Sequence, residues 1–230
     1  MAISRIDSST AHGTPVSDRT PTEPAGTAEN DYVVCLASVT NVDGAWTDPA
    51  DFTEITNKTE TAGNSDAHIY LGFKKRGATA GNGYQFSYGG TAGGMRVTLL
   101  TLRGCDLTNF LDTAYVEGSH YTTSADDPNG TCQPIDTVTN GAWVLAIEQA
   151  SQTITGPTGV PSGYTVAADY MTEINRLHYI ASKLVASAGT ETPGAFTHTD
   201  SVGTADGRLF TLAIRPAGGS KLAVFRRIRG

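Results

Sequence analysis

The sequence predicts an all-β protein, an antiparallel two-sheet sandwich of the jelly-roll type with about eight strands. Three observations lead to this fold class. Only 17% of the 230 residues are charged, while 26 are Gly and 33 are Thr, a composition typical of strands and turns. Several apolar segments alternate with period two, as strands do. The pattern of these segments also occurs twice, which predicts that the strands arise from an internal duplication.

The first segment is rich in Ser, Thr and Pro. Residues 1–30 contain Pro15, Pro21 and Pro24, and proline cannot donate to a strand ladder. We therefore expect an extended N-terminal arm that leads to the first firm strand at Tyr32–Val39.

The domain itself is expected over residues 31–216, with repeat halves at 31–103 and 141–215. Each half opens with an apolar strand, continues through a Pro-bearing turn, has a His near a middle strand, and closes with two arginines seven residues apart. The matching features are Tyr32–Ala37 and Ala142–Ile147, Pro49 and Pro161, His68 and His178, Arg96 with Arg103, and Arg208 with Arg215. With four strands in each half, the count suits a two-sheet sandwich.

The closing strands, Arg96–Arg103 and Leu209–Arg215, show the alternation best. Apolar residues on one side of each predict half-buried strands, with Leu100 and Leu212 at equivalent core positions. The flanking arginines are expected to mark solvated strand ends.

One segment has two possible interpretations. Apolar residues in Tyr170–Ala188 recur at helical spacing, which favours a helix. Its repeat equivalent, Ile69–Lys74, alternates like a strand, and this comparison favours a strand.

The C-terminal segment, residues 217–230, is expected to form a basic arm after the break at Pro216. It carries four positive charges and no acid, and removing them from the net charge of −7 leaves −11 for the rest. An acidic body is a poor nucleic-acid binder, so the arm is expected to bind an acidic protein partner, although a solvated end is the alternative. The candidate partner-binding residues are Lys221, Leu222, Val224, Phe225, Arg226, Arg227, Ile228 and Arg229.

Motifs that carry chemistry are sparse. We find no nucleophile elbow, no phosphate loop and no paired metal-binding histidines, so no catalytic residue, cofactor or metal is predicted. The turn at Asp126–Gly130 resembles a weak Ca²⁺ loop but is better explained as a solvated turn. Cys35, Cys105 and Cys132 are expected to be reduced, with a Cys105–Cys132 disulfide left open. No apolar run is long enough for a membrane span.

The doubled pattern resembles a group of tailed-bacteriophage virion proteins that have a β-sandwich or jelly-roll domain. The residues that carry the resemblance are Gly141–Ile147, Pro161–Thr165, Ala188–Thr190 and Leu209–Pro216, with a weaker first copy at 31–103. Such proteins are capsid decoration (cement) proteins or tail and fibre components, and the resemblance implies no catalytic residues.

The resemblance therefore implies a non-enzymatic virion protein that is made in the host cytoplasm and stabilises the phage head. Its arms would bridge neighbouring subunits by adding strands to exposed sheet edges. The expected partners are the major capsid protein or other virion proteins and further copies of the chain, a trimer by analogy, with no nucleic acid or membrane. The alternative is a tail, fibre or carbohydrate-binding module, with Trp46, Tyr84, Phe86 and Tyr88 lining a groove. A hydrolase of cell-surface polymers is a third, weaker alternative.

Overall fold

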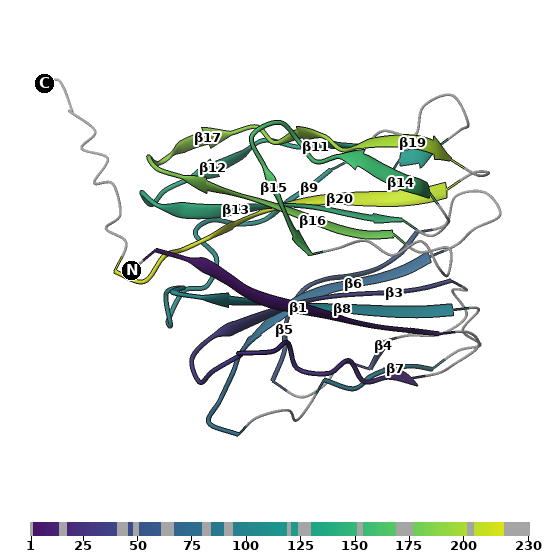
Figure 1. The fold of residues 1–230 in the computed structure, drawn as a ribbon, viewed down its shortest axis with the longest axis horizontal. Coiled ribbons are helices and arrows are strands. Elements are labelled where there is room, and N and C mark those ends of the chain that lie inside the picture. Colours follow the sequence, from purple (N-terminus) through teal and green to yellow (C-terminus); the bar gives the residue numbers. More distant parts are fainter. Residues whose placement is uncertain are drawn as a thin grey trace, which may run out of the picture.

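The computed structural model shows an all-β molecule in which two large antiparallel sheets lie face to face (Figure 1). The structure describes residues 2–13, 18–40, 46–47, 51–60, 67–79, 84–89, 94–118, 121–123, 130–150, 154–168, 177–201 and 205–218. No helix occurs within these ranges. The predicted all-β class is therefore confirmed.

The first sheet has the strand order β1-β8-β3-β6-β5. Its strands are β1 (Ser4–Gly13), β3 (Tyr32–Thr40), β5 (Thr53–Glu60), β6 (Ala67–Lys75) and β8 (Gly94–Arg103). The N-terminal stretch, expected to be an arm, thus begins with an edge strand that pairs along β8 of its own chain.

The second sheet has the order β10-β20-β13-β16-β15, and β9 also pairs with β20. Its strands are β9 (Val116–Glu117), β10 (Tyr121–Thr123), β13 (Ala142–Ala150), β15 (Thr165–Ala168), β16 (Leu177–Val185) and β20 (Ala205–Ile214). The four strands expected at the openings and closings of the two halves are therefore present as β3, β8, β13 and β20. The uncertain segment Tyr170–Ala188 contains strand β16, while its residues 170–176 lie outside the described ranges.

Within each sheet, four strands follow the same path. The order β8-β3-β6-β5 in the first sheet matches β20-β13-β16-β15 in the second, and β5 and β15 each carry a bulge opposite the middle strand. A jelly roll contains two Greek keys, whose four strands have the spatial order 4-1-2-3. Numbered along the chain, the order here is 4-1-3-2, so the jelly-roll arrangement is not confirmed.

Small sheets cover the outer face of each large sheet. The strands β2 (Asp18–Arg19), β4 (Trp46–Thr47) and β7 (Phe86–Tyr88) form a three-stranded sheet on the first. Three two-stranded ribbons lie on the second: β11 (Thr131–Cys132) with β18 (Gly194–Ala195), β12 (Ile135–Thr137) with β17 (Gly189–Glu191), and β14 (Ile154–Gly159) with β19 (Thr197–Ser201).

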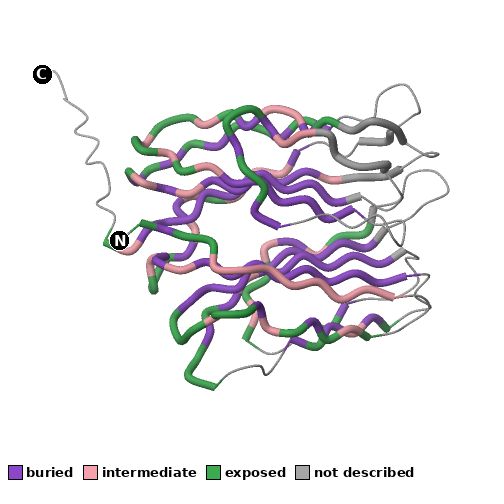
Figure 2. Tube along the Cα trace, viewed as in Figure 1, coloured by how far each residue is buried: buried purple, intermediate pink, exposed green. Residues whose placement is uncertain are grey.

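Three apolar cores result from this layering. A central core between the large sheets contains Leu36 and Leu100 from the first and Leu145 and Leu212 from the second. Each of the two outer cores lies between one large sheet and the strands that cover it. The expectation of half-buried strands is therefore wrong, because both faces of strands such as β8 are buried (Figure 2).

Burial on both faces also overturns the expected role of two of the four strand-end arginines. Arg96 is fully buried and Arg215 is 8% exposed, so neither marks a solvated end. Burial lowers the pKa of Arg96 to about 10, because desolvation disfavours the charged guanidinium.

The proposed equivalence of His68 and His178 is also wrong. His68 lies edge-on to Trp46 in the outer core, whereas His178 hydrogen-bonds to Ser38 of the opposite large sheet. A shift of one residue along a strand moves a side chain to the other face. In the second sheet His178 pairs with Gln149, and in the first sheet Ile69 pairs with Ser38. The strand ladders therefore align His178 with Ile69.

Candidate functional site

The predicted partner-binding residues lie outside the described part of the chain. This holds for all eight positions, Lys221, Leu222, Val224, Phe225, Arg226, Arg227, Ile228 and Arg229, and for the acidic turn at 126–129. What the structure does place is the point from which the C-terminal segment leaves the body.

Both ends of the described chain meet at Gly104. The amide of Ala217 donates to the carbonyl oxygen of Gly104 at 2.8 Å, and Pro216 forms a bridge with Cys105. On its other side Gly104 packs against the backbone of Ala2, so closely that a Cβ would lie 2.5 Å from the Ala2 oxygen. Gly104 also has φ +86°, which favours glycine. The two ends of the described chain, Ala2 and Ala217, therefore lie at one end of the sandwich.

The aromatic residues expected to line a groove are buried instead. Trp46 is 7% exposed, and Tyr84, Phe86 and Tyr88 are at most 2% exposed. They pack edge to face in the outer core of the first sheet. They therefore stabilise the attachment of the small sheet and do not form a platform for a sugar ring.

A surface hollow lies at the end of β6, where three cations follow one another. Two adjoining depressions, of about 540 and 250 Å³, share Asp51, Lys74 and Lys75 as their common wall. We call the pair the lysine trough. Asp51 has φ 72°, a left-handed conformation that Asp tolerates better than most residues.

Lys74 is the most constrained cation of the trough. Its ammonium lies 4.4 Å from the ring centre of Tyr84 and 5.2 Å from that of Phe52, within cation–π range. Burial lowers its pKa, and the carboxylates of Asp51 and Glu23 partly oppose this shift. An ammonium that is already largely desolvated loses less hydration when it meets an anion.

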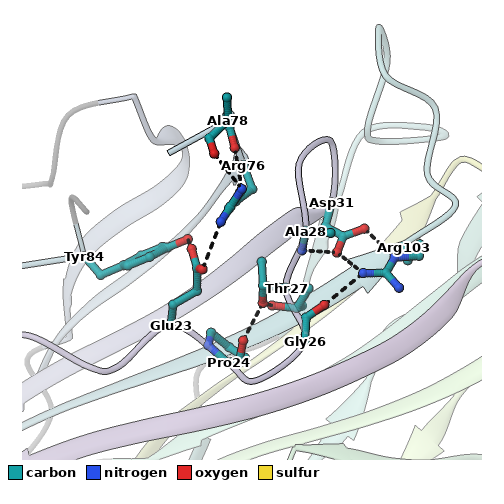
Figure 3. Close-up of polar contacts among 12 residues, drawn as sticks. Glu23, Pro24, Gly26, Thr27, Ala28, Asp31, Arg76, Ala78, Tyr84 and Arg103 are labelled. Atoms are coloured by element: carbon teal, nitrogen blue, oxygen red, sulfur yellow. Dashed lines mark hydrogen bonds and ion pairs between the residues drawn. The ribbon is translucent and has the colours of Figure 1, made fainter. Parts of the chain in front are cut away.

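Arg76 is held in place by the segment that precedes the first predicted strand (Figure 3). It donates to the carbonyl oxygens of Gly77 and Ala78, and its NH2 group lies 3.5 Å from Glu23. Tyr84 donates its hydroxyl to the same carboxylate at 2.9 Å. Burial is the main cause that raises the pKa of Tyr84, and the hydrogen bond to Glu23 raises it further. The smaller depression therefore has fixed walls.

The larger depression is closed by the loop after β8. The carboxylate of Asp106 accepts the amides of Thr108 and Asn109 at 2.9 and 2.8 Å, and the Tyr32 hydroxyl donates to Leu107 O at 3.2 Å. The hydrogen bonds from these two backbone amides lower the pKa of Asp106, and the bond from Asn109 has the larger effect. The side chains of Thr108 and Asn109 are thus presented on a rigid loop.

A second polar cluster lies in the middle of the molecule, between the large sheets. His178 Nε2 lies 2.7 Å from Ser38 Oγ and 3.3 Å from Gln149 Nε2, while Nδ1 lies 3.0 Å from Thr98 Oγ1. Because the Gln149 amide nitrogen only donates, Nε2 accepts and Nδ1 carries the proton. Gln149 also donates to Ala37 O at 2.7 Å. All these side chains are buried, so the cluster joins the sheets and does not face a substrate.

None of the three cysteines forms a disulfide bond, and all three are buried. Burial raises the pKa of Cys105 and of Cys132 to about 12. The open possibility of a Cys105–Cys132 disulfide is therefore not realised. Among the described residues, no three His, Cys, Asp or Glu side chains gather as metal ligands, and no helix is long and apolar enough to cross a membrane.

Sequence reasoning missed the lysine trough, because Lys74 was assigned only to an expected strand. The available signal was Lys74-Lys75-Arg76, a run of three cations in a chain of net charge −7. Comparison of the chain with protein-family models, curated proteins and solved structures finds no match.

Proposed function

We propose that the protein is a non-enzymatic structural component of a tailed-bacteriophage virion, most specifically a capsid decoration (cement) protein. Its C-terminal segment would bridge neighbouring subunits, with the major capsid protein or other virion proteins as partners and a trimer as the unit by analogy. The observation that carries the proposal is the meeting of both chain ends at Gly104. One end of the sandwich would therefore face the particle.

Charge supports the same orientation. The four cations of Lys221–Gly230 follow directly from this end, while the remainder of the chain has a net charge of −11. A basic segment beside an acidic body suits contact with the acidic body of a neighbouring copy. Apolar positions such as Leu222 and Val224 would add strand pairing to this attraction.

We further propose that the eight principal strands arose by internal duplication. The matched strand order and the bulge shared by β5 and β15 support this. Duplicated halves would explain why Arg96 and Arg208 occupy similar ladder positions, opposite Ser38 and Gln149.

Deleting Lys221–Gly230 tests the assembly role. The truncated protein should stay folded, because the last backbone bond that ties the described C-terminal end to the body is made by Ala217. In a co-sedimentation assay, the truncated protein should no longer bind capsids that were prepared without this protein. A full-length variant with Arg226, Arg227 and Arg229 changed to Gln separates the contribution of charge to capsid binding from that of strand pairing. Added salt should weaken the ionic contribution of the unchanged protein but not the backbone pairing. Undiminished capsid binding by the truncated protein would reject the arm mechanism.

The alternative, a tail, fibre or receptor-binding module, is favoured by a different observation. The lysine trough is a surface hollow of a size suited to a small ligand, and Tyr84 is the one member of the sequence-suggested aromatic cluster among its lining residues.

A further inference from the structure

The lysine trough combines three features that belong to one kind of ligand. Its shared wall carries two lysines and one carboxylate, Lys74, Lys75 and Asp51. Arg76 adds a third cation to the smaller depression, and Glu23 lies beside its guanidinium. The wall is thus a local excess of positive charge on a chain whose net charge is −7. Such a wall attracts an anion, and a hollow focuses that attraction.

The larger depression supplies a different kind of contact. Its floor contains Phe73, which is partly buried and packs against Phe110 with ring centres 4.4 Å apart. Thr53, Thr108 and Asn109, whose side chains carry hydroxyl and amide groups, also line this depression. Groups that both donate and accept suit a ligand with hydroxyls, and an aromatic floor suits the apolar face of a pyranose ring.

We propose that the lysine trough binds an acidic saccharide, a chain of pyranose units that carry carboxylates. The ring lies over Phe73 with its hydroxyls toward Thr108 and Asn109, and its carboxylate meets Lys75, which alternation along β6 places on the same face as Phe73. Asp51 favours this ligand over an acidic peptide, because its carboxylate accepts a sugar hydroxyl but repels closely spaced acids.

The site is also preorganised, which reduces the entropy lost on binding. The Asp106 carboxylate fixes the loop that presents Thr108 and Asn109. Lys74 is held between the rings of Tyr84 and Phe52. Exposed Lys75 is the adaptable member and the best position for a substitution that leaves the fold intact.

Calorimetric titration of the full chain with tri-galacturonate tests the proposal. Binding is expected, and neutral maltotriose should bind at least tenfold more weakly. Lys75→Gln should weaken tri-galacturonate binding about tenfold, because it removes the charged donor that meets the carboxylate. Lys183→Gln is the matched control, since it removes the same charge from β16, and it should leave the affinity unchanged. Asn109→Ala should also weaken binding.

Each other outcome overturns the proposal. Equal binding of maltotriose would show that the ligand carboxylates contribute nothing to the affinity. Full competition by sulfate at equal concentration would reduce the trough to a simple anion site. Absence of binding, or equal loss with Lys183→Gln, would show that the trough is not the site. The inference does not rest on the virion role, because the titration uses the isolated protein and the capsid assay uses the C-terminal segment.

Discussion

At the scale of single residues, buried polar groups tie separate parts of the chain together. Asp112 is fully buried and accepts the amides of Val138 and Thr139 at 2.7 and 3.1 Å. Its carboxylate also lies 3.3 Å from Arg215 at the end of β20. One carboxylate thus joins the segment between the two halves to the last strand. Buried carboxylates stay in a core only when they are satisfied in this way.

The central core should depend strongly on Leu212. Its side chain is fully buried between the large sheets. Leu212→Ala should lower the free energy of unfolding by about 2–5 kcal/mol, through lost apolar burial and the cavity left behind. Chemical denaturation measures this loss. Leu184→Ala is the control, because Leu184 is 55% exposed and its truncation should cost under about 0.5 kcal/mol. Equal effects of the two changes would contradict the placement of Leu212.

Asp106 should make stability depend on pH in the acid range. Its pKa is lowered below the ordinary value of 3.8 by the amides of Asn109 and Thr108. A carboxyl group with a lowered folded-state pKa stabilises the fold above its unfolded pKa. This contribution is lost as the pH falls below about 4 and through the lower folded-state value. Asp106→Asn should therefore cost stability at pH 7 and little at pH 2, as measured by denaturation at each pH. A cost that does not change with pH would refute the assignment.

At the scale of elements, the edges of the large sheets are protected. β1, β5 and β15 each contain a bulge, between Arg5 and Ser8, Glu54 and Thr56, and Val166 and Ala168. Bulges interrupt the regular ladder that an edge offers to another chain. Two copies are therefore not expected to join edge to edge through β1, β5 or β15, and contact through the C-terminal segment is the better route.

The N-terminal strand β1 should be needed for stability. It covers β8 along most of its length, and Ile3 contributes to the central core. Deleting residues 2–13 uncovers the β8 edge and removes this apolar contact, so the midpoint of denaturation should fall and aggregation should rise. Light scattering and chemical denaturation measure the two effects. A truncated protein as stable and soluble as the full chain would show that β1 is dispensable.

At the scale of the whole molecule, three stacked cores make the thiols a probe of global unfolding. All three cysteines are buried, and the pKa of Cys105 and of Cys132 is about 12. Because the thiolate is the reactive form, the native protein should not react with Ellman's reagent at pH 8. In guanidinium chloride all three thiols should react. Rapid reaction of the native protein would show that one of the cores opens easily.

The sequence by itself determined the all-β class and the positions of the opening and closing strands, but not the number of strands, which is twenty among the described residues against about eight expected. Tyr32–Val39, Arg96–Arg103, Ala142–Glu148 and Leu209–Arg215 all fall in strands, because alternation and composition are local properties of the chain. The burial of Leu100 and Leu212 was also predictable, since the apolar side of each closing strand contains them.

Only the tertiary structure decided which face meets which neighbour. The second large sheet buries one side of β8 and covering strands bury the other, so Arg96, on the same side as Leu100, lies inside although its spacing indicated a solvated end. Register decided that His178 points between the large sheets while His68 points outward. The lysine trough joins Asp51, the end of β6 and the loop after β8. Such contacts depend on packing between segments far apart in the chain, and no local pattern encodes them.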